Sequence, residues 1–266
     1  MALIGFIGVG NMGYPMLSSA VACFGKEKII MNTKTEERMK YVKEQLGVCY
    51  YTDKKELVEN CKYIILAVKP QFYKEVLEEI KENVTKDHVV ITVAPGFKIS
   101  DIKNTLGNDV KVVRSMPNTP ALVGEGMSGI CYSEDTFSEQ ELEVIAKFFG
   151  SFGKYEVFDE RLMDAVTCAS GSSPAYVYMF IEALADSVVK CGIPRKQAYR
   201  MVAQTVLGSA KMVLETGEHP GALKDQVCSP AGTTIEGVTA LEEYGFRNSI
   251  MKATEKCYNK ATSIKK

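Results

Sequence analysis

The chain has 266 residues, of which 46% are hydrophobic and 24% charged, and its formal net charge is −1. That length exceeds most single domains, so we expect two. The interspersed, nearly balanced charges argue against a nucleic-acid partner and against a membrane surface. No apolar run is long enough to span a bilayer. Because the N-terminus lacks the charged and long apolar regions of a signal peptide, we expect a cytoplasmic protein.

Short apolar runs alternate with amphipathic stretches through the first half of the chain. The pattern predicts strands at residues 2–7, 28–31, 63–68, 89–93 and 110–114, and helices at residues 12–24, 36–46 and 73–80. Strands separated by such helices indicate βαβ units and a parallel sheet. Beyond residue 157, Ala, Met and Val at helical spacing predict helices at residues 162–167, 175–191, 195–216, 234–244 and 246–264. We therefore expect an α/β domain at residues 1–157 and an all-α domain at residues 158–266.

The helix expected at residues 175–191 is apolar over much of its circumference, with Tyr176, Met179, Phe180 and Leu184 among its side chains. Such a helix has to be covered on most sides. The second half of the chain is small for that task, which favours cover by a partner subunit in a homodimer or a larger homo-oligomer. The alternative is a compact monomeric bundle with this helix at its centre.

The eight cysteines are spread along the chain without a Cys-x-x-Cys pair, and there are two histidines, His88 and His219. This composition argues against a structural zinc site, so we expect no metal. Free thiols in a reducing cytosol are the simplest interpretation. His219 precedes Pro220-Gly221, which indicates a residue of a turn rather than a general acid.

A glycine motif, Gly8-Val9-Gly10-Asn11-Met12-Gly13, directly follows the first predicted strand and opens a predicted helix. In that context it indicates a Rossmann-type dinucleotide site rather than an ordinary glycine-rich turn. Gly8 allows the tight turn, Gly10 lets a pyrophosphate approach the backbone, and Gly13 lets the helix pack against the strand. The helix start offers free N–H groups and partial positive charge to the phosphates.

The end of the second predicted strand reads Asn32-Thr33-Lys34-Thr35. NAD-binding proteins place a carboxylate there to hold the ribose hydroxyls. No carboxylate is present here to repel a 2′-phosphate. Thr33 and Thr35 can donate hydrogen bonds and Lys34 supplies positive charge, which favours NADP(H) over NAD(H). The alternative for Lys34 is a solvated lysine in a surface loop.

The segment Leu223–Ile235 is too particular for a routine turn. Ser229 is expected to cap a helix whose first residue is Pro230. The small residues that follow leave the backbone approachable, so this helix start could bind a small carboxylate, with hydroxyls from Thr233 and Thr234. From physical chemistry alone, a capped helix start with nothing bound is an equally good interpretation.

Several stretches of the chain resemble the pyrroline-5-carboxylate reductases, in the same order and over essentially the whole length. The most specific is Lys224–Ile235, which reads Lys-Asp-Gln-Val-Cys-Ser-Pro-Ala-Gly-Thr-Thr-Ile. The others are Gly5–Gly13, Ala67–Gln71, Arg114–Gly126, Asp164–Thr167 and Ser170–Tyr176. The glycine motif alone would be far less specific than this set.

The resemblance implies a Rossmann domain followed by a helical dimerisation domain, in a homodimer or a higher assembly such as a pentamer of dimers. It implies that 1-pyrroline-5-carboxylate is reduced to L-proline with NADPH, or sometimes NADH. The cofactor contacts that it implies, together with those of the glycine loop and strand ends, are Gly8, Val9, Gly10, Asn11, Met12, Asn32, Thr33, Lys34, Ala67, Val68, Lys69 and Gln226. The expected substrate contacts are Glu160, Gly232, Thr233 and Thr234.

Three positions depart from the family pattern. Pro95 stands in the family's Ala-Gly turn, read here as Ala94-Pro95-Gly96, and removes a backbone donor. Ala231 replaces the first glycine of a Gly-Gly pair, and its methyl group is tolerable if φ there is negative. Lys54 replaces an Asn near the adenosine, where it would strengthen binding of a 2′-phosphate.

The expected chemistry is hydride addition to the carbon of a cyclic imine whose nitrogen ends protonated. Because the cofactor supplies the hydride, the protein mainly positions and polarises the substrate. We expect backbone N–H groups around Gly232–Thr234 to hold the carboxylate. Thr234, the expected catalytic residue, orients a protonated imine or a water near the ring nitrogen, and Glu160 stabilises the iminium charge.

Three other functions compete with this one. The continuation Gly13-Tyr14-Pro15-Met16 also resembles the β-hydroxyacid dehydrogenases, but no lysine between Ala165 and Ala185 fits their catalytic position. An imine reductase on a related fold is another enzyme that the pattern allows. A non-catalytic NADPH-sensing protein should carry a damaged substrate segment, whereas Ser229–Ile235 is intact.

Overall fold

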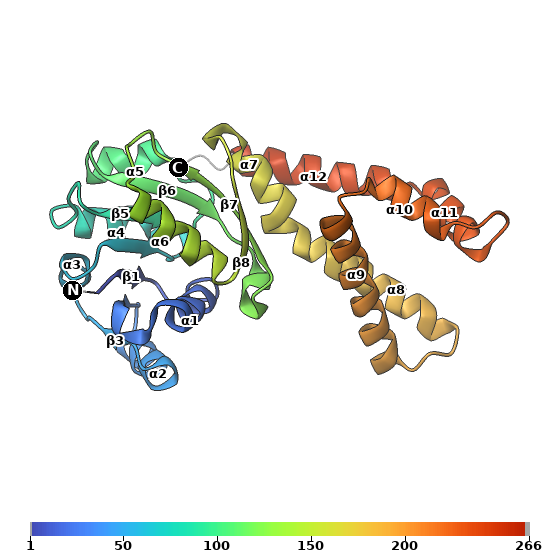
Figure 1. Ribbon diagram of the computed structural model, residues 1–266, viewed down its shortest axis with the longest axis horizontal. Helices are drawn as coiled ribbons and strands as arrows, with labels where there is room; N and C mark the ends of the chain where they lie inside the picture. The colour runs from blue at the N-terminus through green and yellow to red at the C-terminus, as the bar shows by residue number, and fades with distance from the viewer. Residues whose placement is uncertain (1, 264–266) are drawn as a thin grey trace. The chain divides into compact units, whose positions relative to one another are not determined.

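The computed structural model describes residues 2–263 of the protein. An eight-stranded sheet organises the first half of the chain (Figure 1). The strands are β1 (Ile4–Ile7), β2 (Ile29–Asn32), β3 (Cys49–Tyr50), β4 (Tyr63–Leu66), β5 (Val89–Thr92), β6 (Lys111–Met116), β7 (Gly126–Tyr132) and β8 (Gly153–Val157). They lie in the order β3-β2-β1-β4-β5-β6-β7-β8. The pairs are parallel apart from the antiparallel pair of β6 and β7.

Helices cover both faces of this sheet (Figure 1). One buried cluster unites the sheet with α1 (Gly13–Phe24), α2 (Glu36–Leu46) and α6 (Glu139–Gly150). The other unites it with α3 (Lys54–Glu59), α4 (Tyr73–Ile80) and α5 (Ile99–Leu106). Strands β1, β2, β4 and β5 are buried along their whole length, which is why they read as continuous apolar runs. The predicted α/β fold with a Rossmann-type sheet is confirmed.

The sequence pattern did not predict β3, α3, α5, β7, α6 or β8. β3 has two residues and α3 has six. β8, with the sequence Gly-Lys-Tyr-Glu-Val, is an edge strand with exposed positions, so it lacks an apolar run. β7 and β8 also run opposite to the other strands, which a simple series of βαβ units does not include.

The second half of the chain is helical. It holds α7 (Met163–Val166), a π-helical segment (Thr167–Ser172), α8 (Ser173–Lys190), α9 (Arg195–Thr216), α10 (Pro220–Val227), α11 (Thr233–Glu243) and α12 (Phe246–Ser263). The predicted helices are confirmed to within two residues at α8, α9 and α11, whereas α10 is not among the predicted helices. The predicted end of the last helix, at residue 264, lies outside the described residues.

The start of α11 corrects one prediction. Ser229 does not cap this helix and Pro230 is not its first residue, because Gly232 is the N-cap and Thr233 opens the helix. The physical reason is Ala231, whose φ of +54° is left-handed and cannot belong to a right-handed helix. The condition under which the extra methyl group of Ala231 would be tolerable, a negative φ, is therefore not met.

Contacts divide the chain into two compact units, Met1–Ser172 with Tyr258–Lys266, and Ser173–Cys257. The functional boundary between residues 157 and 158 stays a prediction. Within the second unit a small core forms around Ala185, Ala198 and Val202. Much of the apolar surface of α8 is left open, with Tyr178 58% and Met179 67% exposed. Among the described residues, no helix is long and apolar enough to cross a membrane.

Candidate functional site

The carboxyl ends of three neighbouring strands bring the predicted cofactor residues together. Ile7 at the end of β1 pairs with Asn32 of β2 and with Leu66 of β4. The glycine loop, the residues after β2 and the Ala67–Lys69 turn therefore leave the sheet side by side. This edge, where crossover connections diverge from the central strands, is where open α/β sheets bind their ligands.

The glycine loop has the geometry that a pyrophosphate requires. Gly8 has φ +98°, and a Cβ there would lie 2.7 Å from the carbonyl of Ala67. A Cβ at Gly13 would lie 2.3 Å from the carbonyl oxygen of Gly8. At Gly10, by contrast, a Cβ would meet nothing within 4 Å. Two glycines thus permit close packing and the third presents bare backbone to an incoming group.

The remaining loop residues differ in exposure. Val9 is buried, whereas Gly10 and Asn11 are exposed and Met12 is half-buried. Met12 is the N-cap of α1 and makes no side-chain capping hydrogen bond. The N–H groups at this helix start are therefore not capped by its side chain, as an anion site requires.

The segment after β2 contains both structural and accessible groups. The amide nitrogen of Asn32 donates to the carbonyls of Tyr51 (2.8 Å) and Thr52 (3.2 Å), so this buried side chain braces the next connection. Thr33 is half-buried, and Lys34 is exposed with Nζ 4.9 Å above the ring of Phe72. Thr35 caps α2, because its hydroxyl accepts from an N–H of that helix.

Arg38 is a candidate cofactor residue that the sequence analysis missed. Its Nε donates to the carbonyl of Val9 in the glycine loop at 3.3 Å. Its guanidinium lies 5.1 Å from the ring centre of Tyr14 and 4.9 Å from that of Tyr41. An arginine beside the second strand accommodates the 2′-phosphate in NADP-binding folds. The spacing of six residues from Asn32, on the first turn of a predicted helix, was the available signal.

Lys54 does not stand free for a phosphate. Its Nζ makes an ion pair with Glu79 of α4, at 2.7 and 3.0 Å from the two carboxylate oxygens. Only 26% of the lysine side chain is exposed. Its positive charge is thus largely neutralised by its neighbour, which weakens the interpretation of Lys54 as a phosphate ligand.

The turns after β4 and β5 are tied together by Tyr73. Its fully buried hydroxyl donates to the carbonyl of Leu66 and accepts from the N–H groups of Val93 and Ala94, both at 3.2 Å. Ala67 is buried, Val68 half-buried and Lys69 exposed. The donor of Ala94 is consumed and Pro95 has none, so this turn offers a cofactor no N–H from either residue.

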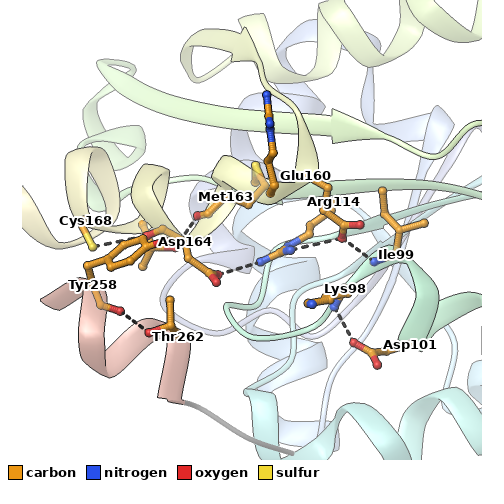
Figure 2. Close-up of polar contacts among 12 residues, drawn as sticks. Lys98, Ile99, Asp101, Arg114, Glu160, Met163, Asp164, Cys168, Tyr258 and Thr262 are labelled. Carbon is orange, nitrogen blue, oxygen red and sulfur yellow. Dashed lines mark hydrogen bonds and ion pairs between the residues drawn. The ribbon is translucent and has the colours of Figure 1, made fainter.

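A cluster of charges lies beside the end of β6 (Figure 2). Arg114, with 6% of its side chain exposed, contacts Glu160 at 3.2 Å and Asp164 at 3.3 Å. Glu160 also accepts a hydrogen bond from the N–H of Ile99 at 2.7 Å. Glu160 was a predicted substrate contact, whereas Arg114 and Asp164 were noted only as parts of motifs.

Asn118 explains another stretch that the resemblance singled out. Its buried amide donates to the carbonyl of Ser170 at 3.1 Å and accepts from the N–H of Met127 at 2.9 Å. A Cβ at Gly171 would lie 2.5 Å from the methyl carbon of Met116. These residues hold the π-helical segment against β6 and β7, which is a structural role.

In the second unit, the start of α11 offers backbone donors. The N–H of Gly232 is already used by the carbonyl of Ser229 at 3.1 Å. Thr233 and Thr234 occupy the first helical turn, where N–H groups have no intrahelical partner, and the N-cap glycine supplies no side chain to satisfy them. Thr233 and Thr234 are therefore the better candidates for holding a carboxylate.

Two polar residues near α10 have local partners. Gln226 is exposed and donates to Glu218 at 2.8 Å. His219 is the N-cap of α10, and its Nδ1 accepts from the N–H of Gly221 at 3.0 Å. The prediction that His219 is a structural residue of a turn is consistent with this capping. Within the described residues, no group of three or more His, Cys, Asp or Glu side chains could hold a metal.

Comparisons with known families match both halves of the chain. Residues 160–264 match the family model of pyrroline-5-carboxylate reductase dimerisation. Residues 3–96 match the model described as NADP oxidoreductase, coenzyme F420-dependent. Similarity to established proteins thus extends from the glycine loop to the last helix.

Individual relatives match over nearly the whole length. A pyrroline-5-carboxylate reductase of Escherichia coli is 45% identical over 99% of this chain and 98% of its own. The structure of the Coxiella burnetii pyrroline-5-carboxylate reductase is 31% identical, with TM-score 0.92, and covers 100% of this chain and 99% of its own. The Plasmodium falciparum enzyme, solved with NADP bound, is 32% identical, with TM-score 0.86 and coverage of 98% and 97%.

Proposed function

The chain belongs to the pyrroline-5-carboxylate reductase family, and we propose that it reduces the C=N bond of 1-pyrroline-5-carboxylate with NADPH to give L-proline, the last step of proline biosynthesis. The observation that carries this proposal is that the sequence similarity extends over nearly the whole chain. The 45% identity extends over 99% of the chain and so includes both the glycine loop and the start of α11. The protein is accordingly an oxidoreductase that acts on a CH–NH group.

The residues at the sheet edge fit a dinucleotide. Gly8, Val9, Gly10, Asn11 and Met12 would hold the pyrophosphate, because Gly10 is bare and the helix start carries no side-chain cap. Thr33, Lys34 and Arg38 would hold the 2′-phosphate, with Asn32 bracing their segment from beneath. Ala67, Val68 and Lys69 would line the nicotinamide side, and the family pattern makes Gln226 a further candidate cofactor contact. NADH would be the weaker donor because it lacks the 2′-phosphate that these cations would bind.

A nicotinamide held by these residues would supply a hydride, which the imine carbon would accept while the C=N electron pair moves to the nitrogen and a proton is taken up there. The chain's own residues orient the substrate for that step. The N–H groups of Thr233 and Thr234 bind the carboxylate at the helix start, where partial positive charge favours an anion. The hydroxyl of Thr234 orients the protonated imine or a water beside the ring nitrogen.

Glu160 complements this arrangement by stabilising positive charge on the ring nitrogen. A protonated imine is far more electrophilic than a neutral one, so a carboxylate that favours it lowers the barrier to hydride addition. The carboxylate is fixed in place by Arg114 and by the N–H of Ile99. Glu160 therefore enters the reaction with one preferred orientation.

The matched dimerisation domain indicates a homo-oligomer. The open apolar side chains of α8, including Tyr178 and Met179, support association through this helix. We propose a homodimer that can assemble further, as in a pentamer of dimers. We also propose a cytoplasmic location, in keeping with eight cysteines that are spread along the chain without a Cys-x-x-Cys pair.

The test follows NADPH absorbance with purified protein. NADPH should be consumed on addition of pyrroline-5-carboxylate, and the product should be L-proline. With 3-hydroxy acids and NADP, absorbance should stay constant, because no lysine occupies the position that β-hydroxyacid dehydrogenases need. Reduction of NADP by a 3-hydroxy acid would favour that family. NADPH binding without turnover of either substrate would favour a sensing protein.

A further inference from the structure

Arg114 shares one guanidinium between two carboxylates in the first unit (Figure 2). Its Nη1 lies 3.2 Å from Oε1 of Glu160, and its Nη2 lies 3.3 Å from Oδ1 of Asp164. The arginine is 5% exposed as a residue, whereas each carboxylate side chain is 32% exposed. The cation is thus buried beneath two carboxylates that still reach solvent.

The two oxygens of Glu160 have different environments. Oε1 accepts hydrogen bonds from Arg114 and from the N–H of Ile99, at 3.2 and 2.7 Å. Oε2 accepts no hydrogen bond from any residue between 2 and 263. One oxygen therefore anchors the side chain to β6 and the start of α5, and the other is left for a ligand.

The charges in this cluster do not cancel. One guanidinium faces two carboxylates, which leaves one negative charge in excess. Neighbouring groups do not neutralise it: Asp159 and Arg161 pair with each other at 3.3 Å in exposed positions. Burial, followed by the charge of Glu160, raises the pKa of the Cys131 thiol to about 12, so that thiol is neutral. The backbone N–H of Lys98 donates to the carboxylate of Asp101 at 2.7 Å, and among the described residues the Lys98 ammonium group makes no ion pair with Glu160 or Asp164.

We propose that Arg114 and Asp164 are positioning residues for Glu160. Arg114 fixes Oε1 so that Oε2 faces the ring nitrogen of the substrate, and Asp164 takes the second arm of the guanidinium. Because Asp164 compensates part of the positive charge of Arg114, the negative charge of Glu160 is not fully neutralised and can select the protonated imine. This inference rests on the proposed function and assigns the charge selectivity of that site to three residues instead of one.

A double-mutant cycle tests whether Arg114 acts through Glu160. Glu160→Gln should lower kcat/KM for pyrroline-5-carboxylate by about 10–100-fold, the scale of a hydrogen bond to a charged group. Arg114→Lys keeps the charge but loses the planar fork, and should cost about 10-fold. In the Glu160→Gln background the same arginine change should cost less than about 2-fold. Additive losses would overturn the proposal.

A pair of inhibitors provides a readout that a purely structural role would leave unchanged. L-proline carries a cationic ring nitrogen, and tetrahydrofuroate has oxygen in its place. Arg114→Lys and Asp164→Asn should each weaken competitive inhibition by L-proline about 10-fold and inhibition by tetrahydrofuroate less than about 2-fold. If a variant weakened inhibition by both compounds equally, or if Asp164→Asn weakened inhibition by neither, the proposed selection of a cationic ring nitrogen would be contradicted.

Controls keep these outcomes distinct from loss of fold or of function. NADPH binding, measured by fluorescence titration, should be unchanged in each variant. Arg161→Lys is the matched control, since the Arg161 side chain is 80% exposed and pairs only with Asp159 among the described residues. If Arg114→Lys fails to fold, Asp164→Asn decides. An unmodified protein without activity on pyrroline-5-carboxylate would contradict the proposed function itself, whereas an active one with additive losses would contradict only this inference.

Discussion

The hydroxyl of Tyr73 donates a hydrogen bond to the backbone carbonyl of Leu66 across 2.5 Å. The same oxygen accepts from the N–H groups of Val93 and Ala94. One fully buried atom thus joins the ends of β4 and β5, from which two of the turns at the candidate cofactor site depart. Burial raises the pKa of this phenol, so it stays protonated and able to donate.

Tyr73→Phe keeps the stacking on Phe97, whose ring centre lies 4.5 Å away, but removes all three hydrogen bonds of the hydroxyl. The N–H of Val93 and the carbonyl of Leu66 keep their longer bond to each other at 3.4 Å, whereas the N–H of Ala94 loses its acceptor. We expect a loss of about 1–3 kcal/mol in the free energy of unfolding. NADPH should also bind several-fold more weakly, because the turns at Ala67 and Ala94 lose their link. Urea unfolding and fluorescence titration measure the two effects. Tyr63→Phe is the control, since no hydrogen bond of the Tyr63 hydroxyl is found among the described residues; equal effects would contradict this role.

Arg38→Ala tests the choice of cofactor. The guanidinium is held against the carbonyl of Val9 and lies over two tyrosine rings. Its removal should lower kcat/KM for NADPH by about 10–100-fold, since a charged contact to phosphate is lost. Catalysis with NADH should change little. Lys40→Ala on the same helix removes an exposed cation paired with Glu36 and should leave both cofactors unaffected. Parallel losses with NADPH and NADH would argue against a phosphate contact.

Thr234→Ala tests the proposed orienting hydroxyl. Turnover of pyrroline-5-carboxylate should fall by about 10-fold or more at unchanged NADPH affinity, because the ring nitrogen loses its polar partner. Thr239→Ala is the matched control on α11, since among the described residues the Thr239 hydroxyl donates only to the carbonyl of Ile235 in its own helix. A Thr234→Ala enzyme with near-normal kcat/KM would remove this residue from the mechanism.

Ala231→Gly should stabilise the protein. With φ at +54°, the alanine Cβ is strained by about 1 kcal/mol, and glycine has no such cost. We expect the free energy of unfolding to rise by up to about 1 kcal/mol. The greater conformational entropy of glycine in the unfolded chain offsets part of this gain. Ala240→Gly in the middle of α11 should instead lower it by about 1 kcal/mol. Urea titration at fixed protein concentration compares them, and a destabilised Ala231→Gly variant would contradict the assigned strain.

Glu141 should make stability depend on acid pH. Burial alone would raise its pKa, but hydrogen bonds from Lys111, from the N–H of Ser138 and from Lys62 outweigh it and lower the pKa to about 2. The stabilisation is therefore complete above the ordinary value of 4.5 and is lost as pH falls from there to about 2.

Glu141→Gln should cost about 2 kcal/mol at neutral pH, the scale of hydrogen bonds to a charged group. The gap between the variant and the unmodified protein should close as pH falls through that window. Unfolding titrations across the window measure the gap. Glu139→Gln, in the exposed first turn of the same helix, should change stability by less than about 0.5 kcal/mol at any pH. A gap that stays constant with pH would contradict the assignment.

The sequence predicted the parts of the fold that depend on local pattern. Buried strands such as Tyr63–Leu66 are continuous apolar runs, and helices such as α2 and α9 carry full amphipathic periods. It did not predict β8 or the start of α11. An exposed edge strand has no apolar run to detect, and the left-handed φ of Ala231 belongs to a residue type that rarely adopts it.

For the candidate site, too, the sequence predicted what depends on local pattern and missed what depends on contacts between distant residues. The glycine loop is contiguous, so its three glycines could be assigned roles from spacing alone. Arg38 and Arg114 act across 29 and 46 residues, on Val9 and Glu160, and nothing local marks such pairs. Lys54 looked available because its partner Glu79 lies 25 residues further along the chain.

Transfer of label from cofactor to product is the most direct test of the proposed reduction. Purified protein is incubated with pyrroline-5-carboxylate and NADPH that is deuterated at the transferable hydride, and the product is examined by mass spectrometry. We expect L-proline that carries a single deuterium, in an amount equal to the NADPH consumed. Oxidation of NADPH without labelled proline, or no oxidation at all, would contradict the account.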